Sequence, residues 1–344
     1  MANSKLHIPA LTLAASLTFL GAGCGGSGSG TTGATGATGA VLAKAGHLEK
    51  TTLNVAVLPD VDSAGFFVAL HQGLFAQEGL TVNYSPAPGS EVIAGQVKGQ
   101  YDITGNNYVS YIEAQFHHQA DLRIIAEGSL LEQGDQVVMT MPNSPITTLA
   151  RLKAHVLGVN ADANVGYLLV ASVLTENGIT MSTKTSANAV MFPKTDIPFT
   201  ERGQALVSGQ LAAAIISEPQ ASQMEEKYGA VVIADLNQGA TQQFPIEGYA
   251  VTKAWAKANP NTLKAFLAAL QAGQQIADTE RAAVEAAVES LKPGQGQVDK
   301  ITAAMMALNT YPLGVDATRL QRVADVMQQF GLLKKHFDIR VMLN

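Results

Sequence analysis

The sequence of 344 residues contains a single cysteine, Cys24. An internal disulfide needs two cysteines and a thiolate metal site needs several, so both are excluded. Charged residues are scarce, at 15 %, and the 22 Lys and Arg are outnumbered by 28 Asp and Glu. A protein that binds nucleic acid normally presents a basic face to the phosphates. The net charge of −6 therefore argues against a nucleic-acid partner.

Hydrophobic residues make up 47 % of the chain, which excludes a disordered chain and allows a buried core. At roughly 150 residues per domain, the length predicts about two domains. The apolar run at residues 8–20 contains Pro9 and is shorter than the ~20 residues that a membrane-spanning helix needs. A permanent transmembrane anchor is therefore not expected.

The N-terminus has the pattern of an export signal. Lys5, the apolar run and small residues before Cys24 predict a signal peptide over residues 1–23. The pattern around Cys24 resembles a bacterial lipobox, although Gly21 stands where Leu is usual. This resemblance implies that Cys24 is acylated and that the protein is held on the outer side of the cell membrane. An ordinary secreted protein, cleaved nearby, is the alternative.

Residues 24–50 are rich in Gly, Ser, Thr and Ala and include an Ala-Thr-Gly repeat. Such a segment cannot bury apolar surface, so it predicts a flexible tether. A tether suits a folded domain that is held at a membrane and must reach a partner there.

From residue 51 onwards, short β-rich runs alternate with amphipathic stretches. Expected strands lie at 53–58, 80–85, 101–105, 122–128, 135–142, 156–160, 187–192, 211–217, 230–236 and 246–252. Expected helices lie at 64–79, 89–99, 108–118, 165–177, 198–209 and 218–228, with four more at 262–277, 280–291, 297–309 and 318–331. This alternation predicts an α/β protein with a mainly parallel sheet.

The order of these elements predicts two α/β lobes and a helical C-terminal region. Residues 51–135 and 252–344 are assigned to lobe I, and residues 136–251 to lobe II. The chain is expected to cross between the lobes near 136–140 and again near 248–251. A ligand would bind in the cleft between two such lobes.

Five segments, in this order, resemble the nitrate/sulfonate/thiamine-pyrimidine substrate-binding proteins of ABC importers. They are GFFVALHQGLFAQEGLTVNY, IAGQVKGQYDITGNN, ITTLARLKAHVLGVNADANVGYLLVASVLTENGI, GQALVSGQLAAAIISEPQASQ and NPNTLKAFLAALQAGQQIA. The resemblance covers about residues 52–290. Ala150 and Arg151 depart from it where Asp is usual, as do His155 where Gly is usual and Ala213 where Asp is common.

The resemblance implies a two-lobed periplasmic-binding-protein fold of type II. It also implies a monomer that captures a small nitrogen- or sulfur-containing solute and delivers it to an importer permease and its ATPase, with no cofactor. A receptor that does not transport is a less favoured function. A pyrimidine-precursor synthase shares the fold but uses a Cys-rich motif, which is absent here, so an enzyme is not expected.

In this architecture, loops at the carboxyl ends of the strands, together with nearby aromatic rings, would hold the solute. The candidate ligand residues are Asp62, Ser63, Phe66, Asn106, Asn107, Tyr108, Asn160, Asn164, Gly166, Tyr167, Phe192, Glu218 and Tyr249. Several of them are equally typical of helix N-caps and first turns, which leaves a structural role open.

The candidate loops contain amides and carboxylates but no Lys or Arg. This favours a neutral or positively polarised flat solute, such as a pyrimidine, over a small anion. A sulfonate or nitrate held by backbone N–H groups is the alternative. His117 and His118 end a helix without a third ligand at a fitting spacing, so no metal site is expected.

Overall fold

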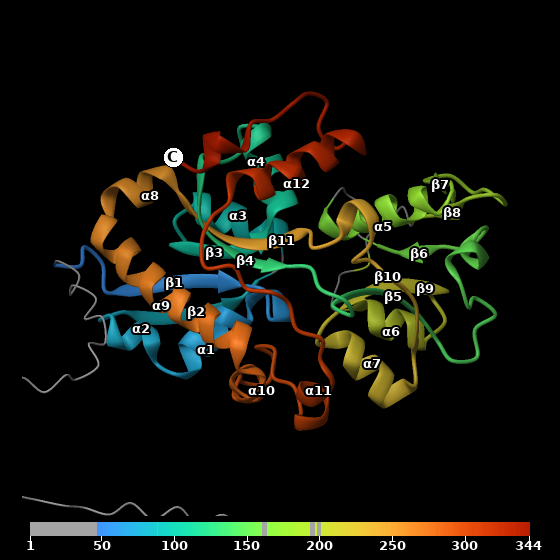
Figure 1. Ribbon diagram of the computed structural model, residues 1–344, viewed down its shortest axis with the longest axis horizontal. Helices are drawn as coiled ribbons and strands as arrows, with labels where there is room; N and C mark the ends of the chain where they lie inside the picture. The colour runs from blue at the N-terminus through green and yellow to red at the C-terminus, as the bar shows by residue number, and fades with distance from the viewer. Residues whose placement is uncertain (1–46, 88, 160–163, 193–196, 198–200) are drawn as a thin grey trace, which may run out of the picture. The chain divides into compact units, whose positions relative to one another are not determined.

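The computed structural model describes residues 47–87, 89–159, 164–192, 197 and 201–344 (Figure 1). Two predicted positions, Cys24 and Asn160, lie outside the described residues, as do the signal peptide and nearly all of the tether. None of the helices in the described ranges combines the length and the apolar character needed to cross a membrane.

The first sheet has five strands in the order β2-β1-β3-β11-β4. Its strands are β1 (Thr52–Val57), β2 (Thr81–Pro86), β3 (Ile103–Asn107), β4 (Leu122–Leu130) and β11 (Pro245–Thr252). β1 pairs in parallel with β2 and β3, whereas β11 pairs antiparallel with both β3 and β4. Seven of the nine residues of β4 are buried and the other two are partly buried, which is typical of a strand covered on both faces.

The second sheet has four strands in the order β10-β5-β9-β6. Its strands are β5 (Gln136–Thr140), β6 (Leu157–Gly158), β9 (Ala213–Ser217) and β10 (Val231–Asp235). β6 and β9 are parallel, whereas β5 is antiparallel to both β9 and β10. A short parallel pair, β7 (Met181–Ser182) and β8 (Val190–Met191), lies outside this sheet.

In each sheet, one strand runs against all the others, and it is the strand that the chain enters directly from the other sheet. The chain passes from β4 to β5 through residues 131–135 and from β10 to β11 through residues 236–244. Neither connection contains a crossover helix of the kind that parallel neighbours require. The expected mainly parallel pairing therefore holds only for β2-β1-β3, for β6-β9 and for the short pair β7-β8.

The second crossing also lies earlier in the chain than the sequence pattern predicted. The prediction placed residues 246–251 in lobe II, with a crossing near 248–251. β11 instead pairs along its length with β3 and β4 of the first sheet. An apolar run predicts a buried strand, but it carries no information about which sheet supplies the partners.

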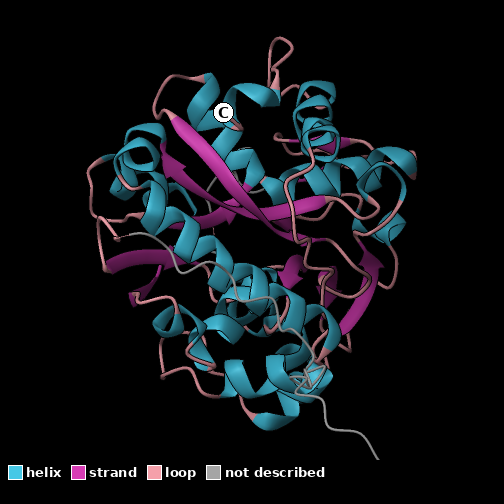
Figure 2. Cartoon of the chain, turned by 60° about the vertical axis from the view of Figure 1, so that its left-hand side comes forward, coloured by secondary structure: helices cyan, strands magenta, loops and turns pink. Residues whose placement is uncertain are grey.

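Helices surround the strands of both sheets (Figure 2). They are α1 (Ala64–His71), α2 (Leu74–Gln77), α3 (Gly89–Val97), α4 (Tyr108–Phe116), α5 (Val165–Glu176), α6 (Arg202–Val207), α7 (Gln220–Tyr228), α8 (Lys253–Ala258), α9 (Pro260–Thr279), α10 (Arg281–Glu289), α11 (Lys300–Met305) and α12 (Ala317–Gln329). Short 3-10 turns are η1 (Val61–Ser63), η2 (Leu149–Leu152), η4 (Gly239–Thr241) and η5 (Ile339–Met342). The predicted α/β alternation and the helical C-terminal region are confirmed.

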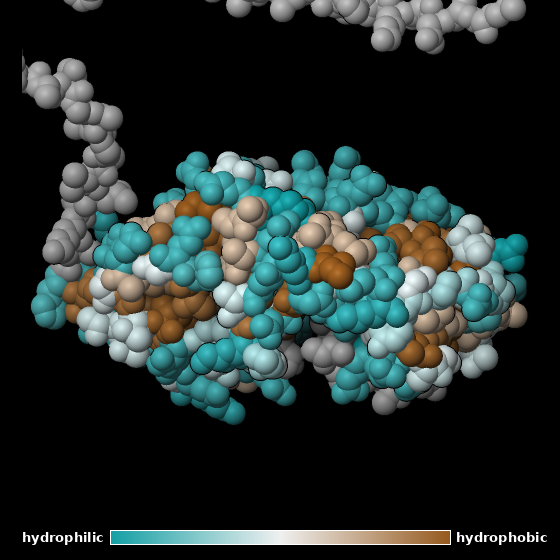
Figure 3. Space-filling view, turned by 90° about the horizontal axis from the view of Figure 1, so that it is seen from below, coloured by the Kyte–Doolittle hydropathy of each residue, from teal (hydrophilic) through white to brown (hydrophobic). Residues whose placement is uncertain are grey.

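The core is built from separate clusters of buried side chains. One includes residues of β1, α1 and α9, and a second includes residues of α4, α5 and α12. α12 shows how the sequence builds such a cluster, since its buried Leu320, Val323, Ala324 and Met327 recur on one helical face. On the face drawn in Figure 3, the apolar residues form separate patches among hydrophilic ones.

Helices α1 and α9 approach each other closely at a pair of glycines. A Cβ atom on Gly273 would lie 2.7 Å from the Cβ of Ala69 and would also strike the carbonyl oxygen of Gly65. Glycine is therefore required here by the space between the helices and not by its backbone angles.

Gly273→Ala is expected to lower the free energy of unfolding by about 1–3 kcal/mol, because the extra methyl group forces the packed helices apart. Chemical denaturation measures this change. Gly314→Ala is the matched control, because no heavy atom outside the chain neighbours lies within 4 Å of its Cβ position. Equal stability of the two variants would contradict the close packing of α1 on α9.

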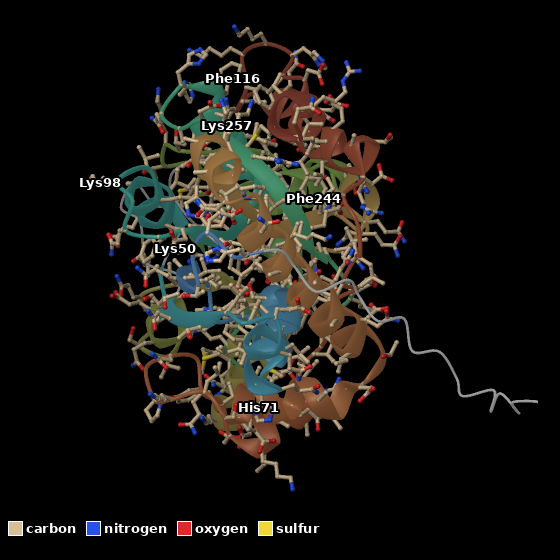
Figure 4. The ribbon with its side chains drawn as sticks, turned by 90° about the vertical axis from the view of Figure 1, so that its left-hand side faces the viewer. Lys50, His71, Lys98, Phe116, Phe244 and Lys257 are labelled. Carbon is tan, nitrogen blue, oxygen red and sulfur yellow. The ribbon has the colours of Figure 1, made fainter. Side chains whose placement is uncertain are left out.

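The start of the described chain is fixed to the first sheet. Nζ of Lys50, which is labelled in Figure 4, lies 2.6 Å from Oδ1 of Asp102. The same carboxylate accepts hydrogen bonds from the backbone N–H of Asn54 at 2.9 Å and from Nε1 of Trp255 at 2.9 Å. Asp102 thus joins the segment before β1 to β1 itself and to α8.

Candidate ligand-binding site

A buried polar cluster lies where β1 ends and β11 begins. Oγ of Ser63, in η1, donates to Oε1 of Glu247 at 2.6 Å. Oγ of Ser129, near the end of β4, donates to Oδ1 of Asp62 at 2.6 Å. Asp62, Ser63, Ser129 and Glu247 are each at most 3 % exposed. Buried carboxylates need such hydrogen bonds to replace water.

Asn309 connects this cluster to the first crossing. Its Nδ2 donates to Oδ1 of Asp62 at 2.8 Å and to Oδ2 of Asp135 at 2.9 Å. The hydroxyl of Tyr311 donates to the carbonyl oxygen of Val61 at 2.9 Å. The segment after α11 therefore holds η1 and the residues before β5 together, at the place where the chain changes sheets.

Three carboxylates, Asp60, Asp62 and Glu247, come within 4.8 Å of one another through one oxygen each. Burial raises the pKa of Asp62 to about 6. Burial first, and then the neighbouring carboxylates, raise the pKa of Asp60 and of Glu247 well above the ordinary range. No ion pair among the described residues involves any of the three.

The loop from β3 to α4 lies beside this cluster. A Cβ atom on Gly105 would lie 2.8 Å from Oε1 of Glu247, so glycine at this position lets the carboxylate approach β3. Oδ1 of Asn107 caps α4 by accepting from the N–H of Ser110 at 2.9 Å. Oδ1 of Asn106 accepts from the N–H of Asn107 at 2.8 Å. The two amides therefore shape the loop as well as being candidate ligands.

The predicted aromatic residues form two separate pairs. The ring centroids of Phe66 and Tyr249 are 6.4 Å apart, and both residues belong to the buried cluster of β1, α1 and α9. The rings of Tyr167 and Phe192 are 5.5 Å apart in an edge-to-face arrangement. Tyr108 is 1 % exposed. A Cβ on Gly248, next to Glu247, would strike the Tyr108 hydroxyl, so this ring is close to the acidic cluster.

In the second sheet, the candidate residues stand at helix N-termini. Oδ1 of Asn164 caps α5 by accepting from the N–H of Gly166 at 3.1 Å and of Tyr167 at 3.4 Å. This arrangement agrees with the helix-cap alternative for Asn164.

Glu218 follows β9 and is 4 % exposed. Its Oε1 accepts from Oγ of Ser222 at 2.8 Å and from the N–H of Ala307 at 3.1 Å, and its Oε2 accepts from the N–H of Ser222 at 3.1 Å. Burial raises its pKa. A carboxylate has about four acceptor positions, so these three donors leave room for about one more.

Sequence reasoning missed several members of the polar cluster. Glu247 is the single charged residue of β11, and this interruption of an apolar strand was a usable signal. Asp60 lies in a loop that the sequence pattern marked, but only Asp62 and Ser63 were selected from it. Asp135 and Asn309 gave no local signal, because Asn309 lies 247 positions from Asp62 and 174 from Asp135.

A family model described as NMT1/THI5 like matches residues 60–280, well over half of the chain. A search of curated protein sequences finds no match. Solved structures with the same fold include the periplasmic aliphatic sulphonate binding protein SsuA from Escherichia coli. It is 20 % identical, with a TM-score of 0.64, and the alignment covers 85 % of this chain and 92 % of that one.

Two further structures agree with this fold. The alkanesulfonate-binding protein SsuA from Xanthomonas axonopodis pv. citri, bound to MOPS, is 17 % identical, with a TM-score of 0.66 and coverage of 85 % and 97 %. The periplasmic nitrate-binding protein NrtA from Synechocystis PCC 6803 is 14 % identical, with a TM-score of 0.67 and coverage of 86 % of both chains. The predicted two-lobed periplasmic-binding-protein fold is confirmed.

Proposed function

Because the chain belongs to the NMT1/THI5-like family, we propose that it is the extracytoplasmic solute-binding protein of an ABC importer. The observation that carries this proposal is the convergence of polar loops from both sheets at the two crossings. Glu218 of the second sheet and Asp62 of the first are both tied to the segment after α11. Such an arrangement suits a clamp that binds a solute between two lobes and then opens at the importer.

The protein acts by binding rather than by catalysis, and it works as a monomer with the permease and ATPase as partners. The proposed solute is a small, flat nitrogenous molecule of the pyrimidine kind. Its support is electrostatic, since the buried carboxylate of Glu218 meets no Lys or Arg in an ion pair of the described chain. Such a site favours hydrogen-bond donors and positive polarity and disfavours an anion.

An aliphatic sulfonate or nitrate is the second candidate. Its support is that two of the similar structures are named as sulphonate- and nitrate-binding proteins. The N-terminus of α5 also carries the positive end of the helix dipole, which favours an anion. The proposed solute contacts, for either class, are the predicted ligand residues on the loops after β1, β3, β6 and β9.

A thermal-shift screen tests the function and separates the two solute classes. Pyrimidines, flavins and amines form one set, and sulfonates and nitrate form the other. A bound solute at 100 times its dissociation constant adds about 2.7 kcal/mol to the stability of the folded protein. Solution scattering on the best hit should show a smaller radius of gyration, because the lobes close on the solute. Binding without any change in scattering would contradict the clamp.

Lipid anchoring is a separate proposal, and it rests on Cys24 after a signal-like run. Cys24→Ser is expected to move the protein from the membrane fraction to the soluble fraction, because the serine hydroxyl is not a substrate for thioether formation. Fractionation and mass spectrometry of the N-terminus measure this change. An unmodified wild-type Cys24 would contradict the proposal.

A further inference from the structure

The carboxylates of Asp60, Asp62 and Glu247 converge from two elements. Asp60 and Asp62 lie in and beside η1, whereas Glu247 comes from β11, and one oxygen of each lies within 4.8 Å of the other two. Their exposures are 6 %, 2 % and 3 %. Like charges held this closely, away from water, repel one another strongly unless a positive charge lies between them.

A second observation concerns Asp60 alone. Its Oδ1 is buried and has no hydrogen-bond partner, although nearly all buried polar atoms in folded proteins have one. By contrast, Oδ1 of Asp62 accepts from Ser129 and Asn309, and Oε1 of Glu247 accepts from Ser63. The surrounding hydrogen bonds therefore orient two of the carboxylates and leave an oxygen of the third without a donor.

We propose that Asp60, Asp62 and Glu247 bind a divalent cation that prefers oxygen ligands, such as Ca²⁺ or Mn²⁺. An ion equidistant from three oxygens that lie 4.8 Å apart is roughly 2.8 Å from each, and small adjustments bring this within the range of Ca²⁺ coordination. The set contains no nitrogen or sulfur ligand, and this composition selects hard cations over Zn²⁺ or Cu²⁺.

Neighbouring side chains donate hydrogen bonds to two of the three carboxylates. Ser63, Ser129 and Asn309 hold Glu247 and Asp62 in fixed orientations, as groups behind metal ligands commonly do. A bare ion also fits the burial of the set better than an organic amine does, because an amine brings a carbon body that needs a cavity of its own. Methylammonium is therefore included in the test as the competing cation.

The bound ion would also stabilise the link between the two lobes at the first crossing. Asn309 joins Asp62 to Asp135 across the first crossing, so a cation that fixes Asp62 also fixes one side of this link. The proposed cation belongs to the protein and is separate from the transported solute. The solute screen can be run with and without a chelator, so failure of one proposal is distinguishable from failure of the other.

Thermal melting of EDTA-treated protein at constant ionic strength tests the proposal. Saturating Ca²⁺ or Mn²⁺ is expected to raise the melting temperature by roughly 5 °C, and methylammonium is expected to leave it unchanged. Electron paramagnetic resonance of Mn²⁺ counts the bound ions and is expected to find one per chain. The absence of a shift with every divalent ion, or a shift with methylammonium alone, would overturn the site.

Asp60→Asn is the more discriminating test, because it is expected to weaken metal binding and yet to stabilise the metal-free protein. The variant is expected to bind Mn²⁺ at least tenfold more weakly and, without metal, to melt at a higher temperature than the wild type, since the cost of burying a carboxyl group beside two others is removed. Glu247→Gln is the second variant, with the same two expectations. Asp121→Asn is the control, since Asp121 is a 71 % exposed acid outside the set, and it is expected to keep the full metal response. A full metal response in Asp60→Asn and in Glu247→Gln would contradict the proposal.

Discussion

Arg319→Met is expected to lower the free energy of unfolding by about 3 kcal/mol, because it leaves the buried carboxylate of Glu127 without its cation. Nε and Nη2 of Arg319 donate to the two oxygens of Glu127 at 2.8 and 3.1 Å. The Glu127 side chain is 0 % exposed and that of Arg319 is 30 % exposed. The pair holds the first turn of α12 on β4. Denaturant unfolding and a melting temperature lowered by roughly 6 °C or more would measure the loss.

Arg340→Met is the matched control for this substitution. Arg340 pairs with Asp338 at 2.7 Å, but its side chain is 74 % exposed, so its removal is expected to change stability by less than about 0.5 kcal/mol. Adding Glu127→Gln to Arg319→Met should recover part of the stability, since no buried charge then remains. Equal losses from Arg319→Met and Arg340→Met would show that burial of Glu127 does not determine the strength of the pair.

Glu218→Gln is expected to weaken binding of a nitrogenous solute by a factor of roughly ten to a hundred. A charge-assisted hydrogen bond to a buried carboxylate contributes about 1.5–3 kcal/mol, which is lost when the carboxylate becomes an amide. Calorimetric titration with the best solute of the screen measures this loss. Tighter binding of a sulfonate by the variant would instead favour the anion alternative.

Ser222→Ala distinguishes two roles of Glu218. One is binding of the solute, and the other is stabilisation of its own loop. Removing the Ser222 hydroxyl deletes one of the three donors to Glu218 but keeps the negative charge. This variant is expected to lose about 1 kcal/mol of stability and to retain most of its solute affinity. If Glu218→Gln and Ser222→Ala lose solute affinity equally, Glu218 stabilises the contact between the lobes and does not bind the solute directly.

The secondary structure was predictable because the pattern of apolar residues carries it locally. The expected strand at 53–58 is β1, the broken helix at 64–79 is α1 and α2, and the helix at 318–331 is α12. The pairing of strands was less predictable. β11 has the apolar pattern of any buried strand, and its place between β3 and β4 depends on contacts with residues more than a hundred positions away.

The residues of the candidate site were likewise predictable where a local sequence pattern marks them, and not where they meet through distant contacts. Asn107 and Asn164 were selected as candidate ligands on loops that follow strands, with a helix cap as the alternative, and both do cap helices. Glu247 was not selected, although it is the single charged residue of an apolar strand, because its partner Ser63 lies 184 positions away in the chain. Whether a polar residue is exposed or buried is decided by tertiary packing, so a cluster of buried carboxylates is visible only in the folded chain.

The attachment of Lys50 to Asp102 determines how a mechanical load on the N-terminal segment would enter the protein. The segment is joined at this point to β1 and, through Trp255, to α8, all of which belong to the first lobe. A pull on the residues just before β1 would therefore pass into the first sheet without crossing residues 131–135 or 236–244. The second sheet has no part in this attachment, so such a force would reach it only after passing through the first sheet.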